Sequence, residues 1–77
     1  MKAFRVYGKY TVDKKHIVWH DFTKDVVGEK EEDAVERVLS TISGTYGIQR
    51  RYIKIEKVEE IKPEDSEDPV VRYHFGV

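Results

Sequence analysis

Residues 49–61 read QRRYIKIEKVEEI, and apolar and polar side chains alternate through the middle of this stretch. In an extended strand, successive side chains point to opposite faces of a sheet. One face therefore receives the isoleucines, Ile53 and Ile55, and suits a dry core. The opposite face receives Arg50, Tyr52 and Lys54, with Arg51 beside them where the strand begins. Cations flanking an aromatic ring suit contacts to phosphate groups and to a nucleobase.

The chain has 77 residues, which is one domain near the lower size limit for a self-sufficient core. It contains no cysteine, so disulfides and thiolate metal sites are excluded and a reducing, intracellular compartment fits best. No apolar run approaches the ~20 residues that span a bilayer. The strand-like pattern begins at the N-terminus, so we expect no signal peptide and no membrane partner.

The net charge is −1, although 38% of the residues are charged. The charges alternate in blocks: residues 1–24 carry +4, residues 25–36 carry −5, residues 37–57 carry +4 and residues 58–77 carry −4. Local potential steers a polyanion more than the total charge does, so the two basic blocks are candidates for nucleic-acid contact. The alternative interpretation is a highly soluble protein with patchy charge.

Two strands are predicted before the helix. Residues 3–12 alternate as a half-buried strand does, and Gly8 within them indicates a β-bulge or a close backbone approach by the overlying helix. Residues 13–15 read as a hairpin turn, and residues 16–27 return as the second strand. The pattern leaves open which large aromatic of this strand faces the core, Trp19 or Phe22.

An amphipathic helix is predicted next. Acidic residues 29–33 suit its first turn, and apolar residues then recur at helical spacing: Ala34, Val35, Val38, Leu39 and Ile42. Gly44 predicts its end in the left-handed conformation. Beyond the third strand, residues 63–69 read as an exposed acidic segment with two prolines. Residues 70–77 leave open a short fourth strand or a loosely docked tail.

The element order is therefore β-β-α-β. A hairpin followed by a right-handed crossover places the third strand beside the first and antiparallel to it, in sheet order 2-1-3. We predict a single α+β domain in residues 1–62, with one helix on one face of a three-stranded antiparallel sheet, followed by the acidic segment and tail in residues 63–77. The open face would display the polar residues of two adjacent strands: Arg5, Tyr7, Lys9, Arg50, Tyr52 and Lys54.

Enzymatic function finds no support in the residues. His16 and His20 lie four strand residues apart, or ~13 Å, too far to share one metal ion. We find no Ser-His-Asp or Cys-His constellation and no phosphate-binding glycine loop, and so small a core cannot enclose a substrate pocket. The acidic residues 29–33 fit a helix start better than a cation site. We therefore expect no catalysis, no metal or other cofactor and no small-molecule substrate.

Nucleic-acid binding has more support. Tyr7 and Tyr52 can stack on bases, although cross-strand packing is their alternative role. The adjacent Arg50 and Arg51 favour an anion between them, because two neighbouring guanidinium groups otherwise repel each other. The hairpin residues Lys14 and Lys15 are a second candidate contact, with an ordinary charged turn as the alternative.

Protein–protein binding is the rival class of function. An exposed strand edge can accept another strand, and an exposed Trp19 would make a good anchor. A third option is a domain that is partly unfolded when free and is ordered by its partner, because binding adds stability by mass action.

Four segments together resemble the archaeal large-subunit ribosomal protein LX family, which is related to a longer eukaryotic large-subunit protein. These segments are AFRVYGKY at residues 3–10, FTKDV at 22–26, EEDAVE at 31–36 and RRYIKI at 50–55. The resemblance extends over about residues 1–70, and the last segment is its most specific part. The chain departs from the usual strongly basic character of ribosomal proteins, and residues 72–77 match no pattern of the family.

The resemblance implies a structural, non-catalytic component of the large ribosomal subunit in the archaeal cytoplasm. Its partners would be large-subunit ribosomal RNA and neighbouring ribosomal proteins, and we expect a monomer when the protein is free. Phe4 and Ile53 would belong to the core. The RNA contacts implied by the matching positions are Arg50, Arg51, Tyr52 and Lys54, to which the residue pattern adds Arg5, Tyr7, Lys9, Lys14 and Lys15. Because the chain is near neutral, only part of its surface can face RNA.

Overall fold

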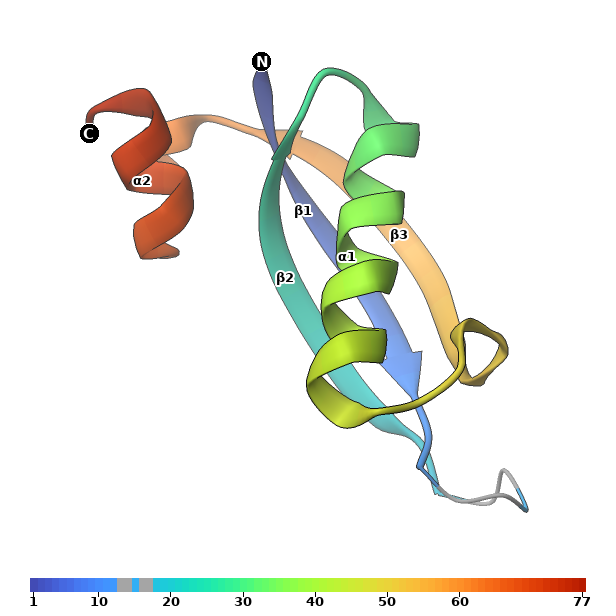
Figure 1. The fold of residues 1–77 in the computed structure, drawn as a ribbon. Helices are drawn as coiled ribbons and strands as arrows, with labels where there is room; N and C mark the ends of the chain where they lie inside the picture. Colours follow the sequence, from blue (N-terminus) through green and yellow to red (C-terminus); the bar gives the residue numbers. More distant parts are fainter. Residues whose placement is uncertain (13–14, 16–17) are drawn as a thin grey trace.

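The computed structural model describes residues 1–12, 15 and 18–77. Three strands form one antiparallel sheet in the order β2-β1-β3, with β1 at Lys2–Tyr10, β2 at His20–Gly28 and β3 at Ile53–Ile61. Helix α1, Glu31–Tyr46, crosses one face of this sheet (Figure 1). The predicted α+β fold and the 2-1-3 order are confirmed, whereas β2 begins at His20 instead of residue 16.

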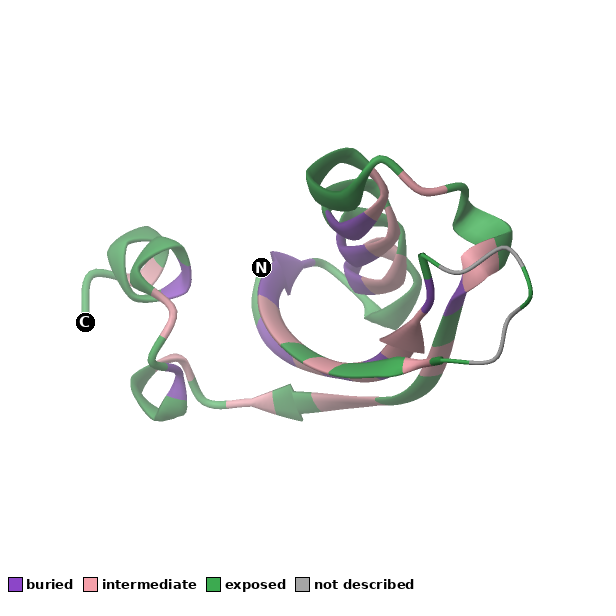
Figure 2. Cartoon of the chain, turned by 90° about the horizontal axis from the view of Figure 1, so that it is seen from below, coloured by how far each residue is buried: buried purple, intermediate pink, exposed green. Residues whose placement is uncertain are grey.

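The main core lies between α1 and the sheet, where the buried sides of the two layers face each other (Figure 2). Seven buried residues form it: Phe4, Val6, Val26, Ala34, Val38, Ile42 and Ile53. Ile55 and Phe22 are partly buried and pack against them. The structure therefore places Phe22 toward the core, whereas Trp19 precedes β2 and lies under the ammonium group of Lys54 on the other side of the sheet. No helix among the described residues is long and apolar enough to cross a membrane.

A β-bulge interrupts the pairing of β1 with β3. Tyr7 pairs with Lys57 and Gly8 with Ile55, so Glu56 is the extra residue. The bulge expected at Gly8 is therefore present. The close approach comes from the carbonyl oxygen of Lys54 and the ring of Phe22 rather than from the helix, so that part of the prediction is wrong.

The end of α1 differs from the prediction. The helix continues through Gly44 to Tyr46 and ends at Gly47, whose φ of 64° is left-handed and whose N–H donates to the carbonyl of Ser43. The last turn is held by side-chain packing, because the ring of Tyr46 stacks on that of Tyr10 with 4.5 Å between the ring centres. This aromatic contact outweighs the low helix propensity of Gly44.

The chain beyond β3 forms a second, smaller core. Residues 63–65 make a turn of 3₁₀ helix, η2, and Pro69–Phe75 form helix α2, whose N-cap Asp68 accepts from the N–H of Val70. Val71 is buried against Ala3 and Val27. The tail is thus a docked helix. It covers one end of the sheet face that the sequence predicted to be open.

Candidate nucleic-acid interface

Cations and aromatic rings gather where β1 ends and β2 and β3 begin. We call this part of the molecule the basic end and define it by Lys9, Lys15, Trp19, Arg51, Tyr52 and Lys54. The molecule measures 42 × 19 × 16 Å, and the acidic first turn of α1 lies at the opposite end of the sheet (Figure 1). The two basic blocks of the sequence are therefore brought together in space. Lys14, the other predicted hairpin contact, lies outside the described residues, as does His16.

Two lysines face each other across the open face of the sheet at the basic end. Lys9 of β1 and Lys54 of β3 are directly paired, and like charges in such positions repel. Lys9 is partly compensated by Glu56 at 3.6 Å. The ammonium group of Lys54 lies 4.6 Å from the centre of the Trp19 ring and has no carboxylate partner among the described residues. This pair is therefore a ready site for an anion.

The segment before β3 is not an extended strand. Arg50–Tyr52 form a 3₁₀ turn, η1, in which the N–H of Tyr52 donates to the carbonyl of Gln49 at 2.9 Å. The Arg51 guanidinium lies 5.0 Å from the centre of the Tyr52 ring and donates to its hydroxyl at 3.2 Å. Within the described part of the chain Arg51 has no carboxylate partner, which leaves its charge available to a phosphate group.

Arg50 points toward α1. Its guanidinium donates to both carboxylate oxygens of Glu36, at 3.1 and 2.8 Å, and to the hydroxyl of Ser40 at 3.0 Å. The prediction that Arg50 shares the open face with Tyr52 and Lys54 is therefore wrong. The alternation was counted through a segment that turns instead of extending, so the side-chain direction changed before β3 began.

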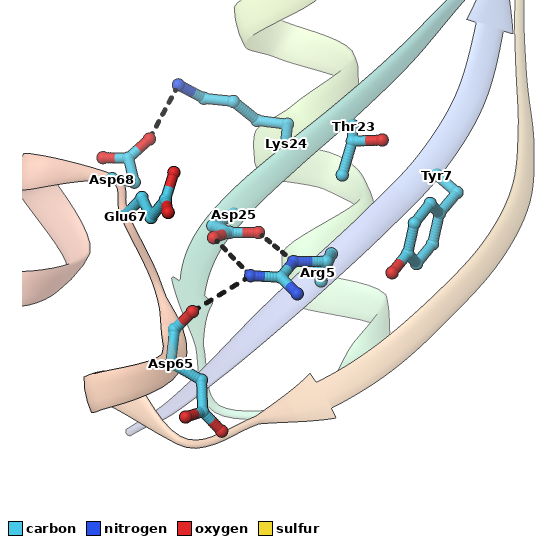
Figure 3. Close-up of a pocket in the computed structure, with 8 residues that line it drawn as sticks. All are labelled: Arg5, Tyr7, Thr23, Lys24, Asp25, Asp65, Glu67 and Asp68. Atoms are coloured by element: carbon cyan, nitrogen blue, oxygen red, sulfur yellow. Dashed lines mark hydrogen bonds and ion pairs between the residues drawn. The ribbon is translucent and has the colours of Figure 1, made fainter.

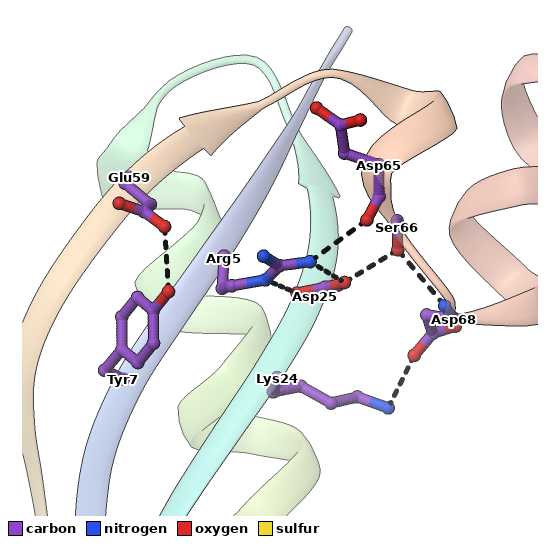
Figure 4. Close-up of polar contacts among 8 residues, drawn as sticks. All are labelled: Arg5, Tyr7, Lys24, Asp25, Glu59, Asp65, Ser66 and Asp68. Atoms are coloured by element: carbon purple, nitrogen blue, oxygen red, sulfur yellow. Dashed lines mark hydrogen bonds and ion pairs between the residues drawn. The ribbon is translucent and has the colours of Figure 1, made fainter.

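Arg5 and Tyr7 do project from the face opposite α1, but acids already bind both of them (Figure 4). Arg5 donates to Asp25 at 2.9 and 3.2 Å and to the backbone carbonyl of Asp65 at 3.3 Å. The Tyr7 hydroxyl donates to Glu59 at 2.8 Å, which raises the pKa of Tyr7 and lowers the pKa of Glu59. These two residues lie in a paired polar network, unlike those of the basic end.

The same network ties the tail to the sheet. Buried Ser66 donates to Asp25 at 2.7 Å, and Lys24 binds Asp68 at 3.2 Å. Figure 3 shows the hollow of about 650 Å³ between this network and η2, into which Arg5 and Asp25 point. Sequence reasoning missed Ser66, because a lone serine in an acidic segment gives no sign of being buried.

The Asp25 carboxylate is the centre of this network. Burial alone would raise its pKa, but hydrogen bonds from Arg5 and Ser66, together with the charges of Arg5 and Lys24, hold the pKa of Asp25 below its usual value. The folded state therefore binds fewer protons than the unfolded state near and below pH 4. The resulting stabilisation is fully present above that range and is lost as the pH falls through it.

We expect Asp25→Asn to lower the free energy of unfolding by about 1–3 kcal/mol at pH 7, the usual cost of losing charge-assisted hydrogen bonds. The difference from the unmodified protein should shrink as the pH falls below ~4, because protonated Asp25 no longer stabilises the fold. Urea titrations at pH 7, 5, 4 and 3 measure this. A difference that stays constant over the series would show that the charge of Asp25 does not stabilise the fold.

Metal binding has no geometric basis in the described residues. Nowhere in residues 1–12, 15 and 18–77 do three His, Cys, Asp or Glu side chains converge so that they could hold a metal ion. The fold and the site thus define a small α+β structural domain whose available cations lie at one end.

Comparison with known proteins assigns this domain to a family. Residues 1–59 match the family described as ribosomal proteins 50S-L18Ae/60S-L20. The chain is 35% identical over 77 residues to the large ribosomal subunit protein eL20 of Methanopyrus kandleri, covering 100% of this chain and 94% of that protein. It is 41% identical over 71 residues to eL20 of Methanocaldococcus jannaschii, covering 92% and 91%.

The chain belongs to the L18Ae/eL20 family of ribosomal proteins. A more distant match, eL20 of Staphylothermus marinus, is 33% identical over 69 residues and covers 88% of this chain and 79% of that protein. The family consists of structural proteins of the cytoplasmic ribosome and not of enzymes. The resemblance seen in the sequence is confirmed.

Proposed function

We propose that this protein is a structural component of the large ribosomal subunit and binds large-subunit ribosomal RNA through its basic end. Arg51 and Lys54 hold phosphate groups, and Tyr52 and Trp19 supply aromatic surfaces beside them. One observation carries the proposal: both cations lie over aromatic rings, and neither has a carboxylate partner among the described residues. Lys9 and Lys15 extend the same surface.

The proposal narrows the contact surface that the sequence suggested. Arg50 is bound by Glu36 and orients η1, so its role is to position Arg51 and Tyr52. Arg5 and Tyr7 stabilise the sheet and tail through Asp25 and Glu59. RNA contact thus needs only one end of the molecule, which agrees with a net charge of −1.

The test is the salt dependence of binding to a large-subunit ribosomal RNA fragment, measured by fluorescence anisotropy. About three neutralised phosphates give a log–log slope of about −2 to −3. We expect Arg51→Ala with Lys54→Ala to flatten this slope by about 1.5–2 units, because each phosphate contact contributes about 0.7–0.9.

The matched control is Arg37→Ala with Lys62→Ala, which removes the same charge from exposed residues outside the basic end. This variant should keep nearly the original slope. Equal slopes for the two double variants would exclude the basic end as the RNA contact.

Neighbouring ribosomal proteins are the second class of partner that we propose. Helix α2 leaves Val70 73% exposed and Tyr73 89% exposed, at a distance along the sheet from the basic end. Exposed apolar side chains on a docked helix suit a protein contact. Substitution of Tyr73 should weaken assembly with such a neighbour and leave RNA affinity unchanged, whereas Trp19, already covered by Lys54, is less suited to this role.

A further inference from the structure

A hollow of about 440 Å³ lies beside η1 at the basic end. One wall is Thr11–Val12, the chain just after β1, and the other is the connection from Gly47 to Gln49 that links α1 to η1. Arg51 and Tyr52 complete the lining. No paired acidic network occupies this hollow, in contrast to the hollow around Arg5 and Asp25.

The walls of the hollow are held in place by hydrogen bonds. The N–H of Thr11 donates to the carbonyl of Tyr52 at 3.0 Å, and the N–H of Ile48 donates to the carbonyl of Ser43 at 3.2 Å. The salt bridge from Arg50 to Glu36 fixes η1 on α1. The hollow is therefore formed before any ligand arrives, so little ordering entropy is lost on binding.

The groups that line the hollow suit a planar, polar ligand. Tyr52 offers an aromatic ring and Arg51 a planar guanidinium, and both stack on nucleobases. The exposed Gln49 side chain makes no hydrogen bond with another described residue. Its carboxamide offers two donors and one acceptor, the set that reads the edge of a base. The same Arg51 can hold the adjoining phosphate group.

The geometry points to a pocket for one unpaired nucleobase of the bound RNA. The base stacks beside Tyr52 and Arg51, and Gln49 hydrogen-bonds to its edge. A base inside a duplex cannot present its face and edge in this way, so the ligand is a nucleotide in a loop or bulge. This inference deepens the proposed RNA binding and depends on it.

The test uses five RNA stems. One stem is fully paired, and the other four carry a single unpaired A, C, G or U at the same position. We expect at least one bulged stem to bind about tenfold tighter than the paired stem, which corresponds to one stacked base. Gln49→Ala should reduce this preference severalfold without changing the salt slope, because it removes no charge. Thr45→Ala, an exposed polar change near the end of α1 but outside the hollow, is the control and should keep the preference.

The possible failures can be told apart. If all four bulged stems bind no tighter than the paired stem, the nucleobase pocket is wrong while RNA binding through the basic end stands. If Gln49→Ala and Thr45→Ala keep the same preference, the base does not occupy this hollow. If the protein binds none of the stems and no large-subunit RNA fragment, the proposed function itself is wrong.

Discussion

Replacing Gly8 with alanine is expected to lower the free energy of unfolding by about 3 kcal/mol, a large fraction of the stability of a domain of this size. A Cβ atom at this position would overlap the backbone carbonyl oxygen of Lys54 and lie 2.8 Å from the ring of Phe22. The carbonyl belongs to β3 and cannot rotate away without breaking its strand. Relief requires a shift of the bulge that sets the register of β1 against β3.

Gly44→Ala is the matched control, because it makes the same chemical change within α1. A Cβ atom there meets nothing within 4 Å, so the methyl group costs no strain. Alanine loses less backbone entropy than glycine on forming a helix, so this variant should be more stable by roughly 0.5–1 kcal/mol. Urea denaturation of both variants measures the contrast. Destabilisation by Gly44→Ala, or an unchanged midpoint for Gly8→Ala, would contradict the packing described here.

The layers of the fold could be predicted from the sequence because each depends on a local period. The alternation around Ile53 and the helical spacing around Val38 assign one face of each element to the core. Only one right-handed connection then satisfies both. Phe4, Val6, Ile53 and Val38 lie in the core for that reason.

Features that depend on distant partners could not be predicted in the same way. Gly44 has the residue type of a helix end, but the ring of Tyr46 gains a stacking partner in Tyr10, and the helix continues to Gly47. Helix α2 has seven residues, too few for a periodic signal, and its apolar side faces Ala3 and Val27. Propensity is a weak guide where tertiary contacts compete with it.

The candidate site shows the same division. Sequence could identify Arg51 and Lys54 as cations beside an aromatic residue, because they are neighbours in the chain. It could not show that Arg5 is neutralised by Asp25, 20 residues away, or that Trp19 lies under Lys54. Ion pairing decides which cations remain available to a phosphate, and pairing is a property of the folded chain.

Val71→Asp is expected to release α2 from the sheet at a cost of about 3 kcal/mol, because it places a charge where the native side chain is 1% exposed. We propose that residues 1–62 are a domain that does not need the tail, since the main core includes no residue beyond Val58. The loss is then confined to the docking of residues 63–77. Amide signals of the tail should move to unfolded positions in NMR spectra, while those of α1 and the main core stay.

Val70→Asp is the matched control, because the adjacent side chain is 73% exposed on the same helix. This variant should keep α2 docked and its spectrum nearly unchanged. Global unfolding by Val71→Asp would show instead that the two cores form one cooperative unit, joined through Ser66, Asp25 and Arg5. RNA affinity distinguishes the two cases as well. A released tail leaves the basic end intact, so binding should persist under the independent-domain proposal and be lost if the whole chain unfolds.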